Sequence, residues 1–151
     1  MKTKTTSLPD RFETISPIDH ESVVFRNYAT NTHIERTLEL AAQNQQAWQQ
    51  TSIQERCAIV NNFLTILAQT KIDLSYHITA QIGRPIQHSP GEIDGVIERC
   101  KYLIETAETS LSHTYPYPEN KKKFIHRKPW GVILVMAPWN YPWLTAINSI
   151  I

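Results

Sequence analysis

One stretch decides the fold predicted for this chain: Gly131-Val132-Ile133-Leu134-Val135-Met136-Ala137-Pro138-Trp139-Asn140-Tyr141-Pro142-Trp143. Residues 131–137 form an unbroken apolar run, which predicts a strand buried on both faces, as in a parallel sheet. Pro138 ends this strand because proline cannot donate a hydrogen bond to a neighbouring strand. Pro142 suits the first turn of a following helix. Since ligands of open α/β sheets bind beyond the carboxyl ends of such strands, Asn140 occupies a position expected for a ligand-contacting residue.

Three amphipathic helices are predicted before this stretch. Thr32-x-x-Glu35 and Ser52-x-x-Glu55 match the capping-box pattern that opens a helix. Ser89-Pro90-Gly91-Glu92 matches it a third time, with proline at the first helical position. The second helix is expected to continue until Gly83. The apolar stripe of the third helix comprises Ile93, Val96, Ile97, Cys100, Leu103, Ile104, Ala107 and Leu111.

Two hairpins and a mobile start complete the predicted organisation. Residues 13–15 and 23–28 read as paired strands joined by a short turn. Residues 114–118 are extended but broken by prolines, which suits an edge strand, and residues 123–128 are expected to return beside them. Residues 1–10 are polar and are expected to be mobile.

The turn Pro138-Trp139-Asn140-Tyr141-Pro142, with Pro129, Gly131 and Val132 before it, resembles the aldehyde dehydrogenase superfamily. Weaker similarity extends upstream to Gly83-Arg84-Pro85, where the family has Gly-Lys-Pro. The resemblance covers about residues 11–151 and corresponds to the first third of a family member.

The resemblance implies an α/β fold, namely the amino-terminal part of the aldehyde dehydrogenase fold. It assigns residues 11–113 and 129–151 to an incomplete Rossmann-like cofactor-binding domain that contains the three amphipathic helices. Residues 114–128 are similar to the β-hairpin extension through which family members form dimers and tetramers. The sequence alone slightly favours an ordinary hairpin with a solvated run of lysines there.

The family oxidises an aldehyde to a carboxylic acid with NAD or NADP through a cysteine thioester. The resemblance implies that the Asn140 side-chain amide stabilises the oxyanion of this reaction. It also implies that Met136, Ala137, Pro138 and Trp139 line the nicotinamide-ribose end of the cofactor cleft. The alternative is that Asn140 is a turn residue that satisfies its own backbone, which would be favoured without the flanking prolines and tryptophan. With them, the functional role is favoured.

Several parts of the family's chemistry have no match in this sequence. The nucleophilic cysteine, the general-base glutamate and the lysine that holds the adenine ribose lie downstream in family members. Cys57 and Cys100 fall on helical apolar stripes and are interpreted as small core residues. The acidic pair Glu92 and Asp94 is interpreted as first-turn and surface charge. The chain is therefore expected to be inactive alone.

Composition excludes some classes of partner. The net charge of +1 gives no indication of nucleic acid or of a membrane surface. There is no apolar run long enough for a transmembrane helix, and no metal-ligand spacing among the histidines and cysteines. Two cysteines fit a reducing compartment, so the expected location is the cytoplasm. The expected partners are an aldehyde and, in the complete enzyme, further copies that form a homo-oligomer.

Two alternatives stay open beside a partial aldehyde dehydrogenase. One is a non-catalytic interaction module derived from the same fold, and the other is an unrelated helical protein. An apolar helix that begins near Leu144 and halts uncapped at Ile151 favours the partial enzyme. The identity of the aldehyde and the choice between NAD and NADP are also open.

Overall fold

The computed structural model describes residues 10–117, 119 and 122–151. The mobility predicted for residues 1–10 falls, apart from residue 10, outside the described residues, as does part of the turn that joins the second predicted hairpin. The elements in chain order are β1 (Arg11–Ile15), β2 (Ser22–Asn27), α1 (Asn31–Trp48), α2 (Ile53–Gln69), α3 (Lys71–Ile82), α4 (Ser89–Leu111) and α5 (Pro142–Ile150).

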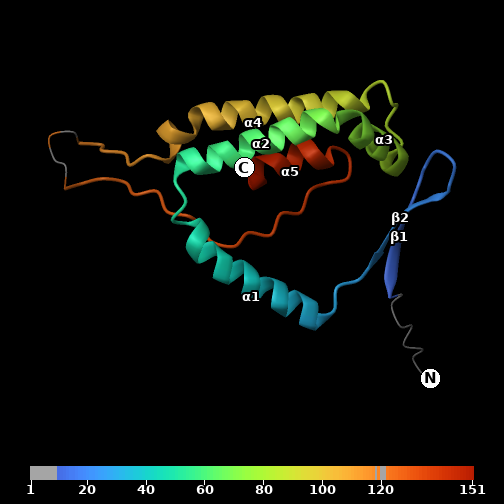
Figure 1. Cartoon of the computed structure of the whole chain (residues 1–151), viewed down its shortest axis with the longest axis horizontal. Coiled ribbons are helices and arrows are strands. Elements are labelled where there is room, and N and C mark those ends of the chain that lie inside the picture. Colours follow the sequence, from blue (N-terminus) through green and yellow to red (C-terminus); the bar gives the residue numbers. More distant parts are fainter. Residues whose placement is uncertain (1–9, 118, 120–121) are drawn as a thin grey trace, which may run out of the picture.

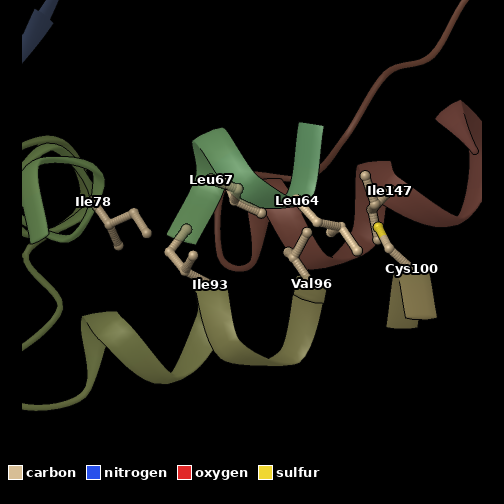
Figure 2. Packing of buried hydrophobic residues seen from close by; sticks show 7 residues of the cluster. All are labelled: Leu64, Leu67, Ile78, Ile93, Val96, Cys100 and Ile147. Carbon is tan, nitrogen blue, oxygen red and sulfur yellow. The ribbon is translucent and has the colours of Figure 1, made fainter. Parts of the chain in front are cut away.

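Helices α2 to α5 form one packed unit, which we call the helical unit. In Figure 1, α2, α4 and α5 lie side by side, with α3 at one end, and α4 contacts the other three. Apolar side chains from all four helices meet between them (Figure 2). The buried apolar residues are Leu64, Leu67, Ile78, Ile93, Val96, Cys100 and Ile147. The predicted packing of the α4 stripe is thus confirmed for its first half, whereas Leu111 at its far end is exposed.

Helix α1 lies apart from the helical unit and has no buried residue (Figure 1). Its start was predicted at Thr32, which is wrong by two positions. Thr30 is the N-cap, and its hydroxyl accepts a hydrogen bond from the His33 amide at 3.2 Å. The capping box predicted for α2 is confirmed, because Ser52 and Glu55 each bond to the backbone amide of the other.

The third predicted capping box does not form. The N-cap of α4 is His88, and no side chain caps it. Ser89 is buried, and its hydroxyl lies 2.8 Å from the Thr79 hydroxyl of α3. It is therefore committed to the contact between α3 and α4 and is not free to cap. Pro90 was predicted at the first helical position and is the second residue of α4, still within its first turn.

The single helix predicted between Ser52 and Gly83 is two helices that meet at Thr70. The Thr70 hydroxyl and amide both donate to the Ile66 carbonyl, at 2.9 and 3.0 Å. The same hydroxyl bond occurs within unbroken helices at Thr65 and Thr106, so the break is marked instead by the Thr70 backbone, with φ of −98° and ψ of 6°. The change of direction brings Ile78 into contact with the core. Gly83 ends α3 in the left-handed conformation, with φ of 74°, as predicted.

The amino-terminal hairpin is confirmed. β1 and β2 pair antiparallel, with Arg11 opposite Asn27 and Thr14 opposite Val24. The turn between them is closed by the amide of the buried Ser16, which donates to the Glu21 carbonyl at 2.8 Å.

Residues 129–138, which we call the extended segment, are not a strand. The prediction of a central buried strand over residues 131–137 is therefore wrong for this structure. In Figure 1 the segment crosses between the hairpin loop and α5 without pairing to another segment. Its apolar side chains are mostly exposed, and Leu134 is 81% exposed. A parallel strand needs neighbours that accept and donate its backbone hydrogen bonds, and no described residue fills that role.

The second predicted hairpin is reduced to one point of pairing among the described residues. Thr114 and Ile125 exchange two backbone hydrogen bonds, of 3.1 and 2.8 Å. The loop around this bridge projects away from the helical unit (Figure 1). The strands predicted there are therefore not continuous over the described residues 114–117 and 123–128.

Candidate active site

Asn140 lies where the extended segment turns into α5. Pro142 is the first residue of α5, as predicted, and Tyr141 precedes it as the N-cap. The Asn140 side chain is exposed and makes no hydrogen bond within the described part of the chain. Its backbone carbonyl, in contrast, accepts a hydrogen bond from Arg84. The turn is thus held through its backbone, and the side-chain amide is left available.

A carboxylate from α4 caps the first turn of α5. The Oε1 atom of Glu92 accepts hydrogen bonds from the Trp143 amide at 2.9 Å and from the Leu144 amide at 3.2 Å. These amides have no partner within the helix, because they belong to its first turn. A negative charge at this position also interacts favourably with the helix dipole. The Glu92 side chain is 0% exposed, so its charge needs these partners.

The second oxygen of the same carboxylate faces Arg84. The Nη1 atom of Arg84 forms an ion pair with Glu92 Oε2, while Nη2 donates to the Asn140 carbonyl. The guanidinium also lies over the Tyr141 ring, 4.2 Å from its centroid. Arginine can make these contacts together, because its donors diverge from a flat group that stacks on aromatic faces. We call Arg84 and Glu92 the anchor pair.

The interpretation of Glu92 as a surface charge is wrong. A signal was present in the sequence, because Glu92 precedes Val96 by four positions and so lies on the apolar stripe of α4. A carboxylate on a buried face requires a partner. The interpretation holds for Asp94, which is 58% exposed and pairs with Lys71 at 2.6 Å. No local pattern identified Arg84 as the partner of Glu92.

The two cysteines do not join this site. Cys100 lies in the core beside Ile147 (Figure 2), and burial raises the pKa of its thiol. Because the thiolate is the nucleophilic form, burial makes Cys100 unreactive, in agreement with its predicted role in the core. Cys57 is half-buried and lines an open groove of about 530 Å³ between α2, α4 and the end of α5. None of the predicted site residues lines that groove.

The four residues predicted to line the cofactor cleft lie together on the extended segment. They are Met136, Ala137, Pro138 and Trp139, and all are exposed, with Met136 at 84% and Trp139 at 75%. The structure therefore presents an apolar surface directly before Asn140. The described residues leave Met136 and Trp139 of this surface largely uncovered.

No group of three or more histidine, cysteine or carboxylate side chains within residues 10–117, 119 and 122–151 is arranged to hold a metal ion. None of the helices built from these residues has the length and apolarity needed to cross a membrane.

Residues 3–151 match the sequence model of the aldehyde dehydrogenase family. The chain belongs to this family. It is 24% identical over 128 residues to the D-glyceraldehyde dehydrogenase (NADP(+)) of Thermoplasma acidophilum, which covers 84% of this chain and 26% of that protein. It is 29% identical over 136 residues to the succinate-semialdehyde dehydrogenase [NADP(+)] of Deinococcus radiodurans, which covers 89% of this chain and 28% of the relative. The chain therefore spans about a quarter of the length of these curated relatives.

Solved structures show the same fold. The NADP-dependent glyceraldehyde-3-phosphate dehydrogenase from Bacillus halodurans, complexed with NADP, superposes with a TM-score of 0.82 at 20% identity. The match covers 93% of this chain and 31% of that one. A succinic semialdehyde dehydrogenase from Streptococcus pyogenes, in complex with NADP+, gives a TM-score of 0.81 at 23% identity, over 91% of this chain and 30% of the other. The predicted partial α/β fold of the family is confirmed.

Proposed function

We propose that this chain supplies the amino-terminal part of an NAD(P)-dependent aldehyde dehydrogenase, and that the Asn140 side chain is a donor of the oxyanion hole. One observation carries the proposal. The Asn140 amide is exposed and unpaired within the described chain, while the backbone at Asn140 and after it is held by Arg84 and by Glu92 of α4. A fixed backbone with an available donor is the arrangement that stabilises a charge formed during reaction.

In the proposed reaction, a cysteine thiolate attacks the aldehyde carbon and the carbonyl oxygen gains the negative charge. The Asn140 amide donates a hydrogen bond to that oxygen and lowers the energy of the tetrahedral state. An amide suits this task because it stays neutral and needs no proton transfer. Arg84 and Glu92 hold the backbone of the turn, so the amide can be presented without a rearrangement of the turn.

Met136, Ala137, Pro138 and Trp139 fit a role at the nicotinamide-ribose end of the cofactor, since their exposed apolar surface ends at Asn140. The dinucleotide, when bound, supplies the hydride acceptor. We propose that residues 129–138 of this chain pair with strands of the remaining part of the enzyme. That pairing would satisfy their backbone groups and cover their apolar side chains.

The nucleophile and the general base must then come from the remaining part of the enzyme. Cys100 is sealed in the core, and Cys57 lies in a groove that none of the predicted site residues lines. We therefore expect residues 1–151 alone to give no NAD(P)-dependent aldehyde oxidation.

A hybrid enzyme tests this function. Residues 1–151 replace the corresponding part of the Bacillus halodurans enzyme, and turnover is measured with glyceraldehyde-3-phosphate and NADP. Asn140→Ala should lower kcat by about 10²- to 10³-fold, with little change in KM, because the donor acts on the transition state. The matched control is Asn148→Ala, which removes an amide of α5 that bonds only the Leu144 carbonyl. A folded hybrid without turnover, or equal kcat for both variants, would contradict the proposal.

The same exposed residues favour a second candidate, a non-catalytic interaction module that uses the extended segment to bind another protein. Leu134 and Met136 are the exposed side chains that such a partner would cover. The hybrid distinguishes the two functions. Restored turnover that depends on Asn140 favours the enzyme, whereas a folded but inactive hybrid favours the module.

We also propose that residues 114–128 are the oligomerisation extension, and that residues 11–113 and 129–151 are part of the cofactor domain. One support is that this loop projects from the helical unit (Figure 1). The other is its exposed aromatic rings, among them Tyr115 and Phe124, whose ring centroids lie 5.7 Å apart. In the hybrid, Tyr115→Ser with Phe124→Ser should lower the molar mass measured by light scattering. An unchanged mass would contradict this assignment.

A further inference from the structure

We propose that Arg84 and Glu92 are positioning residues for the oxyanion donor, an inference that rests on the function proposed for Asn140. Neither side chain need touch the substrate. Their role is to fix the backbone at Asn140 and directly after it, so that its amide points to one place.

The contacts that support this role form one connected set. Glu92 binds the amides of Trp143 and Leu144, which follow the turn, at 2.9 and 3.2 Å. Arg84 binds the carbonyl of Asn140 itself and covers the ring of Tyr141. The two side chains are joined by their ion pair. Every residue from 140 to 144 except Pro142 is therefore tied to the anchor pair.

The rest of the turn offers little alternative support. The extended segment before it is mostly exposed and pairs with no described segment. A shift of the turn would therefore meet little resistance if the anchor pair were lost. Because catalytic donors lose effect steeply when displaced by about 1 Å, a small shift of Asn140 is enough to slow the reaction.

In this chain the residue at position 84 is arginine, where the family has lysine, and its guanidinium makes three contacts at once. A lysine can keep the ion pair with Glu92, but its single ammonium cannot also reach the Asn140 carbonyl as a fixed fork, nor stack flat on Tyr141. Arg84→Lys is thus expected to preserve the fold and to loosen Asn140. Glu92→Gln keeps an oxygen for the α5 amides and removes the charge that holds Arg84.

The first test is a double-mutant cycle in the hybrid enzyme. Arg84→Lys should lower kcat by about 10- to 10²-fold with little change in KM. If Arg84 acts through Asn140, the same substitution should have almost no further effect in the Asn140→Ala background. Equal losses in both backgrounds, or no loss in either, would overturn the inference.

The outcomes for the inference and for the proposed function are distinguishable. Full activity of the Asn140→Ala variant would contradict the proposed function, and the inference with it. A large loss of kcat for Asn140→Ala, together with an additive or absent effect of Arg84→Lys on kcat, would contradict only the inference.

The second test uses residues 1–151 as they are and needs no turnover. In amide hydrogen exchange followed by NMR, Glu92→Gln should speed exchange at Trp143 and Leu144 by about 10-fold or more, since a neutral acceptor binds these amides more weakly. Both Glu92→Gln and Arg84→Lys should shift the Asn140 side-chain amide signals. Asp94→Asn is the matched control, because Asp94 lies on the same helix and pairs with Lys71 instead. Equal changes for Asp94→Asn and Glu92→Gln would contradict the inference.

Discussion

The helical unit and the extended segment are both rich in apolar residues, yet only the first buries them. Ile93 in α4 is 0% exposed, whereas Leu134 in the extended segment is 81% exposed. The difference lies in what each element needs from its neighbours. A helix satisfies its own backbone hydrogen bonds, so α4 requires only apolar faces to pack against, and α2, α3 and α5 provide them. A strand requires backbone partners first. An apolar run in the sequence therefore predicts burial only where the segment that would pack against it or pair with it is also present.

The largest expected effect in this comparison is a core truncation. Ile93→Ala should lower the free energy of unfolding by about 2–5 kcal/mol, because it removes buried contacts and leaves a cavity. Leu134→Ala removes a similar side chain from the extended segment and should cost less than about 0.5 kcal/mol. Urea unfolding followed by circular dichroism measures both. Similar losses would show that the extended segment is packed in solution.

Two glycines with positive φ give the next contrast. Gly83 has φ of 74°, and an added Cβ would lie 2.8 Å from Pro17 Cγ, whereas Gly131 has φ of 100° and open space around it. Gly83→Ala should destabilise the fold by about 1–3 kcal/mol through backbone strain and this contact.

Gly131→Ala should cost less than Gly83→Ala, since the unpaired extended segment can change its backbone angles. Thermal unfolding of the two variants measures the difference. A greater loss at Gly131 would mean that its conformation is held by the rest of the molecule.

A smaller effect is expected at the start of α2. Ser52→Ala should lower stability by about 1 kcal/mol, because it removes the side chain that caps the helix. Thr32→Ala is the control, since Thr32 was predicted as a cap but Thr30 performs that role. Its effect should stay within about 0.5 kcal/mol. A larger loss for Thr32→Ala would contradict the observed start of α1.

The smallest effect concerns pH. Hydrogen bonds from the Ser52 hydroxyl and then the Ser52 amide lower the pKa of Glu55 below its ordinary value. A lowered folded-state pKa adds stability above the unfolded value, and this stability is lost as pH falls through the folded value. Carbon NMR titration should show the low pKa, and Ser52→Ala should raise it towards the ordinary value. An unchanged titration in Ser52→Ala would contradict this cause.

The sequence allowed prediction of features that depend on near neighbours along the chain. The Ser52 cap, the Gly83 helix end and the Pro142 helix start each follow from residues within a few positions. The resemblance also pointed to Asn140, but its role is still a prediction. The role of the anchor pair was missed because its contacts in the turn are distant along the chain, with Glu92 and Trp143 51 positions apart. The break at Thr70 was missed because apolar spacing continues across it, while packing against α4 decides the direction of α3.

The docking of α5 on α4 has a consequence for the chain between them. Residues 112–141 leave the helical unit and return to it, and both ends of this excursion are fixed. The entropy of closing such a loop grows only logarithmically with length, by about 0.6 kcal/mol for each doubling. The projecting loop can therefore gain or lose residues while Asn140 keeps its place. Under the assembly role proposed for this loop, insertions and deletions there would change assembly without disturbing the turn.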